Sequence, residues 1–303
     1  MTARSANHMI VTRSGPLRAD GAVAVMGILN LTPDSFFDGG WYTEPERAIA
    51  RGEEMVAEGA DALDLGGEST RPGATPVQAE EELRRVLPTL RRLRALVQVP
   101  ISVDTYKARV ARAAIGEGAD IINDVSAGRF DPEMLAVVAG SEAHIVLMHM
   151  QGTPADMQLS PTYPRDDVVT AVVELLSERA AAAQAAGVAP ERIILDPGIG
   201  FGKSTAHNLA LISRLDALVA LGYPVLVGPS RKRFLGEITG SGPENRLEGT
   251  AAAVALAVDR GSAIVRVHDV VAMVRVVRVA DACRRARDPD LSRSQRDAPY
   301  AGR

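Results

Sequence analysis

Four polar side chains stand at or shortly after the ends of short apolar runs, and together they could bind a flat ligand. They are Asp104, Asn123, Asp196 and Lys232. A carboxylate can accept from a ring N–H and an exocyclic amine together, an amide offers both polarities, and a lysine donates to a ring nitrogen or a carbonyl. If the fold brings them together, the set suits a heterocycle with several N–H groups and a carbonyl.

A second group of residues would attract an anion. Arg71, Arg266 and His268 suit a phosphate or a diphosphate. Asn30 offers a hard oxygen for Mg²⁺, which takes few protein ligands and fills its shell with phosphate and water. Taken alone, each residue also has a structural interpretation, because an Asp or Asn after a strand often caps a turn or a helix. The prediction therefore depends on all of them meeting at one place.

The loop after Asp196 looks like a phosphate-binding loop but does not match one. Its sequence is Pro-Gly-Ile-Gly-Phe-Gly-Lys-Ser over residues 197–204. Pro197 stands where a P-loop needs glycine, and Lys203 stands where the dinucleotide-binding fingerprint needs its third glycine. The glycines still allow positive φ and a close approach of a ligand to the backbone. We therefore interpret the stretch as a buried strand that delivers the Asp196 carboxylate to a tight loop.

An alternation of strands and helices must position these side chains. Short apolar runs, typical of strands buried on both faces, alternate with longer segments of helical periodicity. Eight such units predict a (β/α)8 TIM barrel, in which the chemistry lies at the carboxyl ends of the strands. A doubly wound open sheet is the alternative, although its glycine fingerprint is missing. The predicted strands are 23–29, 62–65, 101–103, 121–122, 145–148, 193–195, 225–227 and 264–267, and helices are predicted near 45–59, 78–97, 106–118, 131–140, 166–187, 206–221, 246–260 and 269–286.

The length of the chain indicates a single domain. Its 303 residues fit one barrel, since such domains have about 250 residues. We predict an N-terminal extension over 1–20, which could form a hairpin under the barrel, and the barrel itself over 21–287. The polar tail over 288–303 contains two prolines and is expected to be disordered.

Composition and charge argue against several classes of function. The net charge of −4 speaks against a nucleic-acid partner. The single cysteine, Cys283, leaves no disulfide framework and no thiolate metal cluster. No apolar run approaches the ~18 residues of a membrane span. We expect a cytoplasmic protein that acts on small molecules, without a nucleic-acid or membrane partner.

Several motifs, in order, resemble those of the dihydropteroate synthase family of pterin-binding TIM barrels. Residues 26–36, Met-Gly-Ile-Leu-Asn-Leu-Thr-Pro-Asp-Ser-Phe, are similar to its first signature, and residues 196–203 resemble a second. The resemblance covers roughly residues 22–285 and includes two loops that the wider pterin-binding barrels lack in this form. The remaining motifs stand at 68–73, 102–105, 123–126, 230–232 and 266–269.

The resemblance implies a transferase of folate biosynthesis. Such an enzyme condenses 6-hydroxymethyl-7,8-dihydropterin diphosphate with p-aminobenzoate to give 7,8-dihydropteroate and pyrophosphate. The resemblance further implies Mg²⁺ as a cofactor held by Asn30, and a homodimer formed through helices on one side of the barrel. Phe37 stands where the family commonly has serine, and this departure could make the enzyme insensitive to sulfonamides, which mimic p-aminobenzoate.

The resemblance also implies a role for each site residue. The catalytic set is Asp104, Asp196, Lys232, Arg266 and His268, with Arg266 stacked on the pterin ring and close to the diphosphate. The carboxylate of p-aminobenzoate is expected at the helix start near Lys232, where free N–H groups favour anions. The residues expected to line the substrate pockets are Asn123, Met148, Thr70, Arg71, Pro72, Phe36, Gly200, Phe201, Gly228 and Arg233.

Two other functions stay open at this point. A related barrel enzyme could pass a methyl group from a methyl-tetrahydrofolate to a corrinoid, but it would have no use for Arg71, Arg266 and His268 as an anion site. A non-enzymatic relative could bind a pterin or act as a scaffold, and loss of the loop motifs would favour it. None of those motifs is lost.

Overall fold

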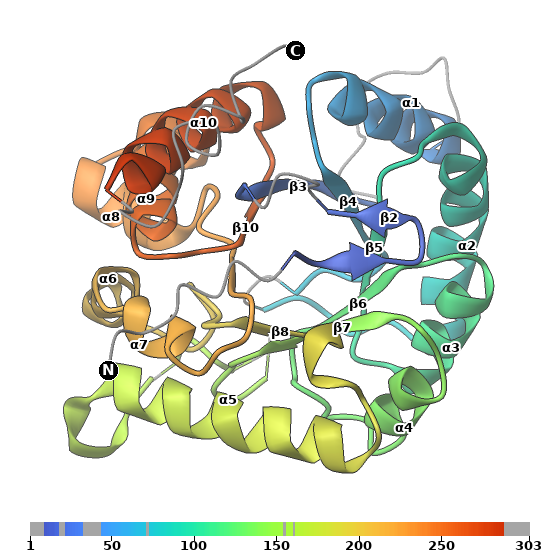
Figure 1. Cartoon of the computed structure of the whole chain (residues 1–303), viewed down its shortest axis with the longest axis horizontal. Helices are drawn as coiled ribbons and strands as arrows, with labels where there is room; N and C mark the ends of the chain where they lie inside the picture. The colour runs from blue at the N-terminus through green and yellow to red at the C-terminus, as the bar shows by residue number, and fades with distance from the viewer. Residues whose placement is uncertain are drawn as a thin grey trace.

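A ring of parallel strands forms the centre of the molecule (Figure 1). The computed structural model describes residues 9–17, 22–32, 44–70, 73–153, 156–159 and 161–287. The strands follow one another in the order β8-β7-β6-β5-β4-β3-β10-β9, and a parallel bridge between Leu195 and Val225 joins the two ends. The predicted (β/α)8 TIM barrel is therefore confirmed. Its strands are β3 (Ala24–Asn30), β4 (Ala62–Gly66), β5 (Ile101–Asp104), β6 (Ile121–Asp124), β7 (His144–Met148), β8 (Ile193–Asp196), β9 (Leu226–Val227) and β10 (Ile264–Val267).

Helices surround the ring, and they differ from the predicted set in two places. The helix predicted over 206–221 is two helices, because Arg214 leaves helical geometry with φ −114° and ψ 32°. A short helix, α8, was not predicted, since seven residues carry too little apolar periodicity. The helices are α1 (Glu44–Ala57), α2 (Ala79–Leu96), α3 (Ala108–Gly116), α4 (Met134–Ala139), α5 (Val168–Ala185), α6 (Thr205–Ser213), α7 (Asp216–Val219), α8 (Arg233–Thr239), α9 (Leu247–Asp259) and α10 (Val270–Ala286), with 3₁₀ turns at Pro164–Asp166, Pro190–Arg192 and Pro243–Asn245.

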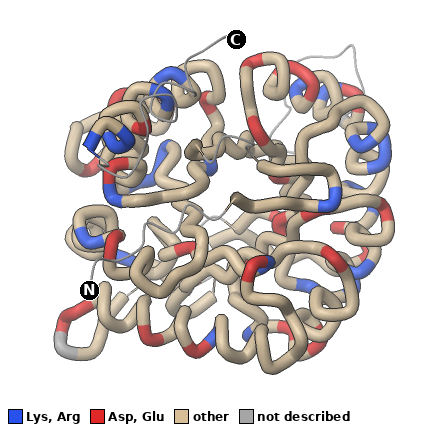
Figure 2. The backbone as a smooth tube through the Cα atoms, in the orientation of Figure 1, with Lys and Arg blue, Asp and Glu red and all other residues tan. Residues whose placement is uncertain are grey.

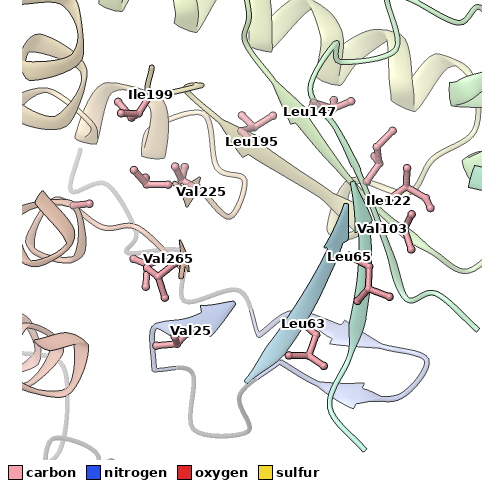
Figure 3. Packing of buried hydrophobic residues seen from close by; sticks show 14 of the residues in the cluster. Val25, Leu63, Leu65, Val103, Ile122, Leu147, Leu195, Ile199, Val225 and Val265 are labelled. Carbon is pink, nitrogen blue, oxygen red and sulfur yellow. The ribbon is translucent and has the colours of Figure 1, made fainter. Parts of the chain in front are cut away.

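Alternate residues of each strand face opposite sides of the barrel wall. Leu63, Leu65 and their equivalents pack outward against the helices (Figure 3). Their neighbours face the interior, as the period of two along a strand requires. The interior-facing residues near the strand starts form an apolar floor: Ala24, Met26, Ala62, Ile121, Val146, Ile194, Leu226 and Ile264.

A hairpin closes the lower end of the barrel and confirms the one expected in the N-terminal extension. Strands β1 (Val11–Thr12) and β2 (Gly15–Pro16) pair antiparallel and cross the ring in Figure 1. The flanking side chains of Ile10 and Leu17 pack into the apolar floor. The upper end, where the strands terminate, is thus the end left for a site.

The remaining expectations concern the chain ends, membrane spans and charge. The tail over 288–303 and the first eight residues lie outside the described residues. Among the described residues, no helix has the length and apolar character needed to span a membrane. Figure 2 shows acidic and basic residues interspersed along the helices.

Candidate active site

The strand register brings the predicted residues into one row at the upper end of the barrel. Asn30 of β3 aligns with Gly66 of β4, Gly66 aligns with Asp104 of β5, and Asp104 aligns with Asn123 of β6. Since the strands are parallel, these residues share one edge of the sheet. The register thus places the backbones of Asn30, Asp104 and Asn123 side by side at this edge.

The guanidinium of Arg266 joins this row from β10. Its Nε donates to Asp64 Oδ2 at 2.5 Å, and its Nη2 donates to Asp104 Oδ2 at 3.0 Å. Asp64 is fully buried and was missed in the sequence, where we treated 62–65 as a continuous apolar run. An acid at an interior-facing position of an apolar strand is the signal that could have found it, because a buried charge needs a partner.

Both predicted acids have pKa values raised towards neutrality. Burial raises the pKa of Asp104 to about 7 against the opposing effect of Arg266, and the nearby carboxylates of Asp64 and Glu82 add to the rise. Burial raises the pKa of Asp196 to about 6, while the Gly198 N–H and Lys232 oppose the rise. Perturbed carboxylic acids of this kind are typical of functional sites.

The loop after β8 is pressed against the end of β7. Asp196 Oδ1 accepts a 2.7 Å hydrogen bond from the Gly198 N–H. Gly198 has φ +66°, and a Cβ built there would overlap the carbonyl oxygen of His149. Lys203 is buried, and its ammonium donates to the Phe201 carbonyl at 2.9 Å and lies 3.0 Å from His149 Nδ1. Lys203, whose role the sequence left open, therefore holds this loop to β7.

Lys232 connects the two predicted substrate regions. It precedes the first residue of α8, and its Nζ lies 4.1 Å from the centroid of the Phe201 ring. A Cβ at Gly200 would lie 2.9 Å from Lys232 Cδ, so glycine leaves room for the lysine stem. Phe201 packs in a small buried cluster with Met148, which places Met148 in the same wall.

His268 and Ser230 form a neighbouring pair beside Arg266. Ser230 Oγ lies 3.0 Å from His268 Nδ1 and accepts from the His268 N–H at 3.2 Å. Burial lowers the pKa of His268 to about 3, with further lowering by Arg266 and Arg231. The imidazole is therefore neutral at pH 7 and would serve an anion as a hydrogen-bond donor rather than as a charge.

Other predicted residues lie at the rim or outside the described part. The Arg233 guanidinium is 79% exposed and pairs with Glu237 at 2.6 Å, so this side chain is directed along α8. Gly228 faces Arg266, whose Cβ would lie 3.7 Å from a Cβ at Gly228. Thr70 is half-buried. Residues Arg71, Pro72, Phe36 and Phe37 lie outside the described residues.

The donor set fits a weakly held Mg²⁺ ion. Among the described residues no cluster of three His, Cys, Asp or Glu side chains could hold a metal. Asn30 offers one hard oxygen, and glycine at position 66 leaves room beside it, since a Cβ there would lie 3.8 Å from Asn30 Oδ1. A single protein ligand matches an ion that completes its shell with phosphate and water.

Known proteins that belong to one family match this chain along most of its length. The family described as "Pterin binding enzyme" matches residues 26–268. The dihydropteroate synthase of Synechocystis sp. is 48% identical over 85% of this chain and 89% of its own length. This chain belongs to the dihydropteroate synthase family.

Solved dihydropteroate synthases share the fold closely. The Xanthomonas albilineans enzyme with 4-aminobenzoic acid is 50% identical, has a TM-score of 0.83, and is matched over 90% of this chain and 96% of that chain. A second structure of that enzyme, with 7,8-dihydropteroate, is 46% identical, has a TM-score of 0.80, and is matched over 90% and 97%. Membership of the dihydropteroate synthase family favours the synthase over the methyl-transfer and non-enzymatic alternatives.

Proposed function

We propose that this chain condenses 6-hydroxymethyl-7,8-dihydropterin diphosphate with p-aminobenzoate, forming 7,8-dihydropteroate and pyrophosphate. The observation that carries the proposal is the pair of buried acids, Asp104 and Asp196, close to the cations of Arg266 and Lys232 at the upper end of the barrel. Solved relatives in complex with 4-aminobenzoic acid and with 7,8-dihydropteroate support one substrate and the product of this reaction.

The chemistry breaks the C–O bond between the pterin methylene and the diphosphate and forms a C–N bond to the arylamine. A pterin ring can delocalise the cation left when the C–O bond breaks. Ionised Asp104 and Asp196 would stabilise that cation, because fixed charges act strongly in a buried site. An arylamine with a low pKa is already neutral at pH 7, so it attacks without a dedicated base and then releases one proton.

The leaving group needs its own stabilisation. Arg266 and His268 lie at the end of β10 and would donate to the departing pyrophosphate together with Arg71. Mg²⁺ held by Asn30 would supply further positive charge to the diphosphate. For the second substrate, we infer a slot beside Phe201 and Gly200, completed by Thr70, Pro72 and Phe36.

The direct test is pyrophosphate release by the purified chain. Release should require both substrates and Mg²⁺, and it should stop when either substrate or the metal is left out. A folded protein that releases no pyrophosphate under the complete conditions would overturn the proposal. Repeating the assay with a sulfonamide present tests the effect predicted for Phe37.

Lys232 and Asn30 should affect different steps. Lys232→Ala should raise the KM for the pterin substrate about 10–100-fold, the loss typical of a hydrogen bond from a charged donor. Asn30→Ala should leave that KM closer to normal but lower kcat and raise the Mg²⁺ concentration needed for half-maximal rate. Steady-state kinetics with varied pterin and varied Mg²⁺ separate the two. Normal turnover in both variants would show that the roles are assigned wrongly.

We further propose that two copies of the chain associate through α9 and α10. These adjacent helices (Figure 1) carry large apolar side chains that are exposed in one copy: Leu247 40%, Leu256 55%, Val271 42% and Val279 66%. Burial of such side chains against the same surface of a second copy is a common source of dimer stability.

The dimer prediction can be tested by placing charged side chains on the proposed interface. The double variant Leu256→Glu, Val279→Glu should shift the mass measured by light scattering from dimer to monomer, because carboxylates would be buried between the copies. Leu159→Glu is the control, since Leu159 is 83% exposed and belongs to the segment between β7 and α5 rather than to α9 or α10. A monomeric wild type, or a double variant that stays dimeric, contradicts the proposal.

A further inference from the structure

Asp64 lies inside the barrel and joins two residues of the proposed pterin pocket. Its side chain is fully buried on β4. One carboxylate oxygen, Oδ2, accepts from Arg266 Nε at 2.5 Å and from Asn123 Nδ2 at 3.2 Å. The other, Oδ1, has no hydrogen-bond partner within the described part of the chain. A buried acid in this position affects its neighbours through geometry as well as charge.

The first effect concerns the side-chain amide of Asn123. An ionised carboxylate only accepts hydrogen bonds, so the amide must turn its NH₂ group towards Asp64. The carbonyl oxygen, Asn123 Oδ1, is then the atom left for a ligand. That oxygen is buried and has no partner among the described residues. The pocket therefore offers an acceptor at this point and selects a ligand with an N–H donor there.

The second effect concerns Arg266. Its guanidinium is shared between Asp64 and Asp104. When a ligand's N–H groups take over the Asp104 carboxylate, Arg266 still keeps Asp64 as its ion-pair partner. Without Asp64, the arginine would depend on Asp104 alone and would compete with the ligand for it, because an unpaired buried charge is costly.

We propose that Asp64 is a positioning residue that sets the amide of Asn123 and holds Arg266 away from full pairing with Asp104. It thereby determines the hydrogen-bonding specificity of the pocket without touching the reacting atoms. The inference rests on the proposed function, since it concerns the pterin half of that reaction.

The test compares Asp64→Asn with Ser102→Ala. Ser102 is the register neighbour of Asp64 on β5, is fully buried, and has a hydroxyl without a partner in the described residues, so it controls for disturbance of the barrel interior. Asp64→Asn should raise the KM for the pterin substrate at least tenfold and leave the KM for p-aminobenzoate within twofold. Ser102→Ala should leave both within threefold. Equal KM values in Asp64→Asn and wild type would overturn the inference.

A pH profile separates positioning from simple destabilisation. Asp104 faces the acids Asp64 and Glu82 and the cations Arg266 and Lys232. Removing the charge of Asp64 should move the acid limb of kcat/KM for the pterin substrate to lower pH by about one unit, since a like charge is lost. A lower rate with an unmoved limb would count against the proposal.

A measurement on the wild type covers the case in which Asp64→Asn does not fold. The NH₂ signal of Asn123, assigned by its loss in Asn123→Ser, should be protected from hydrogen exchange both with and without 6-hydroxymethyl-7,8-dihydropterin. Protection that arises only with the pterin would overturn the inference. Absence of turnover in the wild type would instead reject the proposed function, so the two failures are distinct.

Discussion

Replacing Asp196 with asparagine should lower kcat/KM for the pterin substrate about 10²–10³-fold, the usual cost of removing one group that stabilises transition-state charge. The fold should survive, because an asparagine oxygen can still accept the 2.7 Å hydrogen bond from the Gly198 N–H. Wild-type activity should also fall as pH drops through about 7 and then about 6, where the buried Asp104 and Asp196 carboxyls become protonated in turn. Steady-state rates between pH 5 and 8 test both statements.

The Asp196→Asn substitution should lower activity without lowering the stability of the folded protein. The folded-state pKa of Asp196, about 6, lies above the ordinary value of 3.8. The ionised carboxylate therefore destabilises the folded protein above pH 6, and this penalty disappears as pH falls towards 4. At pH 7 the asparagine variant should melt no lower than wild type, and any advantage should shrink on acidification. A variant that melts much lower at pH 7 would indicate that Asp196 is primarily structural.

Gly198→Ala should destabilise the protein by about 3–5 kcal/mol, at the upper end of single-substitution effects. A Cβ here would overlap the His149 carbonyl oxygen and lie 3.0 Å from the carbonyl carbon. Both atoms belong to the backbone at the end of β7, so neither can turn aside. The loop must move, and the Asp196–Gly198 hydrogen bond is lost with it. Denaturant unfolding measures the cost, and activity should fall with it.

Gly240→Ala is the matched control for this prediction. Gly240 has φ +70°, close to the +66° of Gly198, but a Cβ there meets nothing within 4 Å. The control should therefore show only the backbone cost of a left-handed alanine, about 1 kcal/mol. Similar losses in the two variants would mean that backbone conformation, and not the contact with β7, makes glycine necessary at position 198.

The outline of this fold could be predicted because local patterns carry it. Buried parallel strands are mostly apolar, and their ends were marked by Asn30, Asp104 and Asn123, which the register aligns, and by Asp196, the last residue of β8. The break between α6 and α7 could not be predicted in the same way. Leu211, Leu215 and Leu218 are all buried on either side of it, so the apolar period continues although the helix does not.

The contacts between side chains could not be predicted from the sequence, for a different reason. Arg266 of β10 pairs with Asp64 of β4, with strand β3 between them, and the two residues stand 202 positions apart in the chain. Nothing in the spacing indicates such a pair, because it depends on strand order and on which residues face inward. The same applies to Lys203, whose contact with His149 comes from the folding of a loop back on a neighbouring strand.

The apolar floor under the site has a consequence for how such a protein can change over time. Ile194 and Asp196 face the same interior from one strand, about 7 Å apart, yet Ile194 belongs to the floor that the hairpin seals. A polar replacement at Ile194 would leave an unpaired group in hydrocarbon and cost the fold. A replacement at Asp196 changes the recognition and the chemistry of the pocket but leaves the floor intact. New substrate preferences can therefore evolve, or be selected in the laboratory, in the upper layer alone while the lower layer preserves the fold.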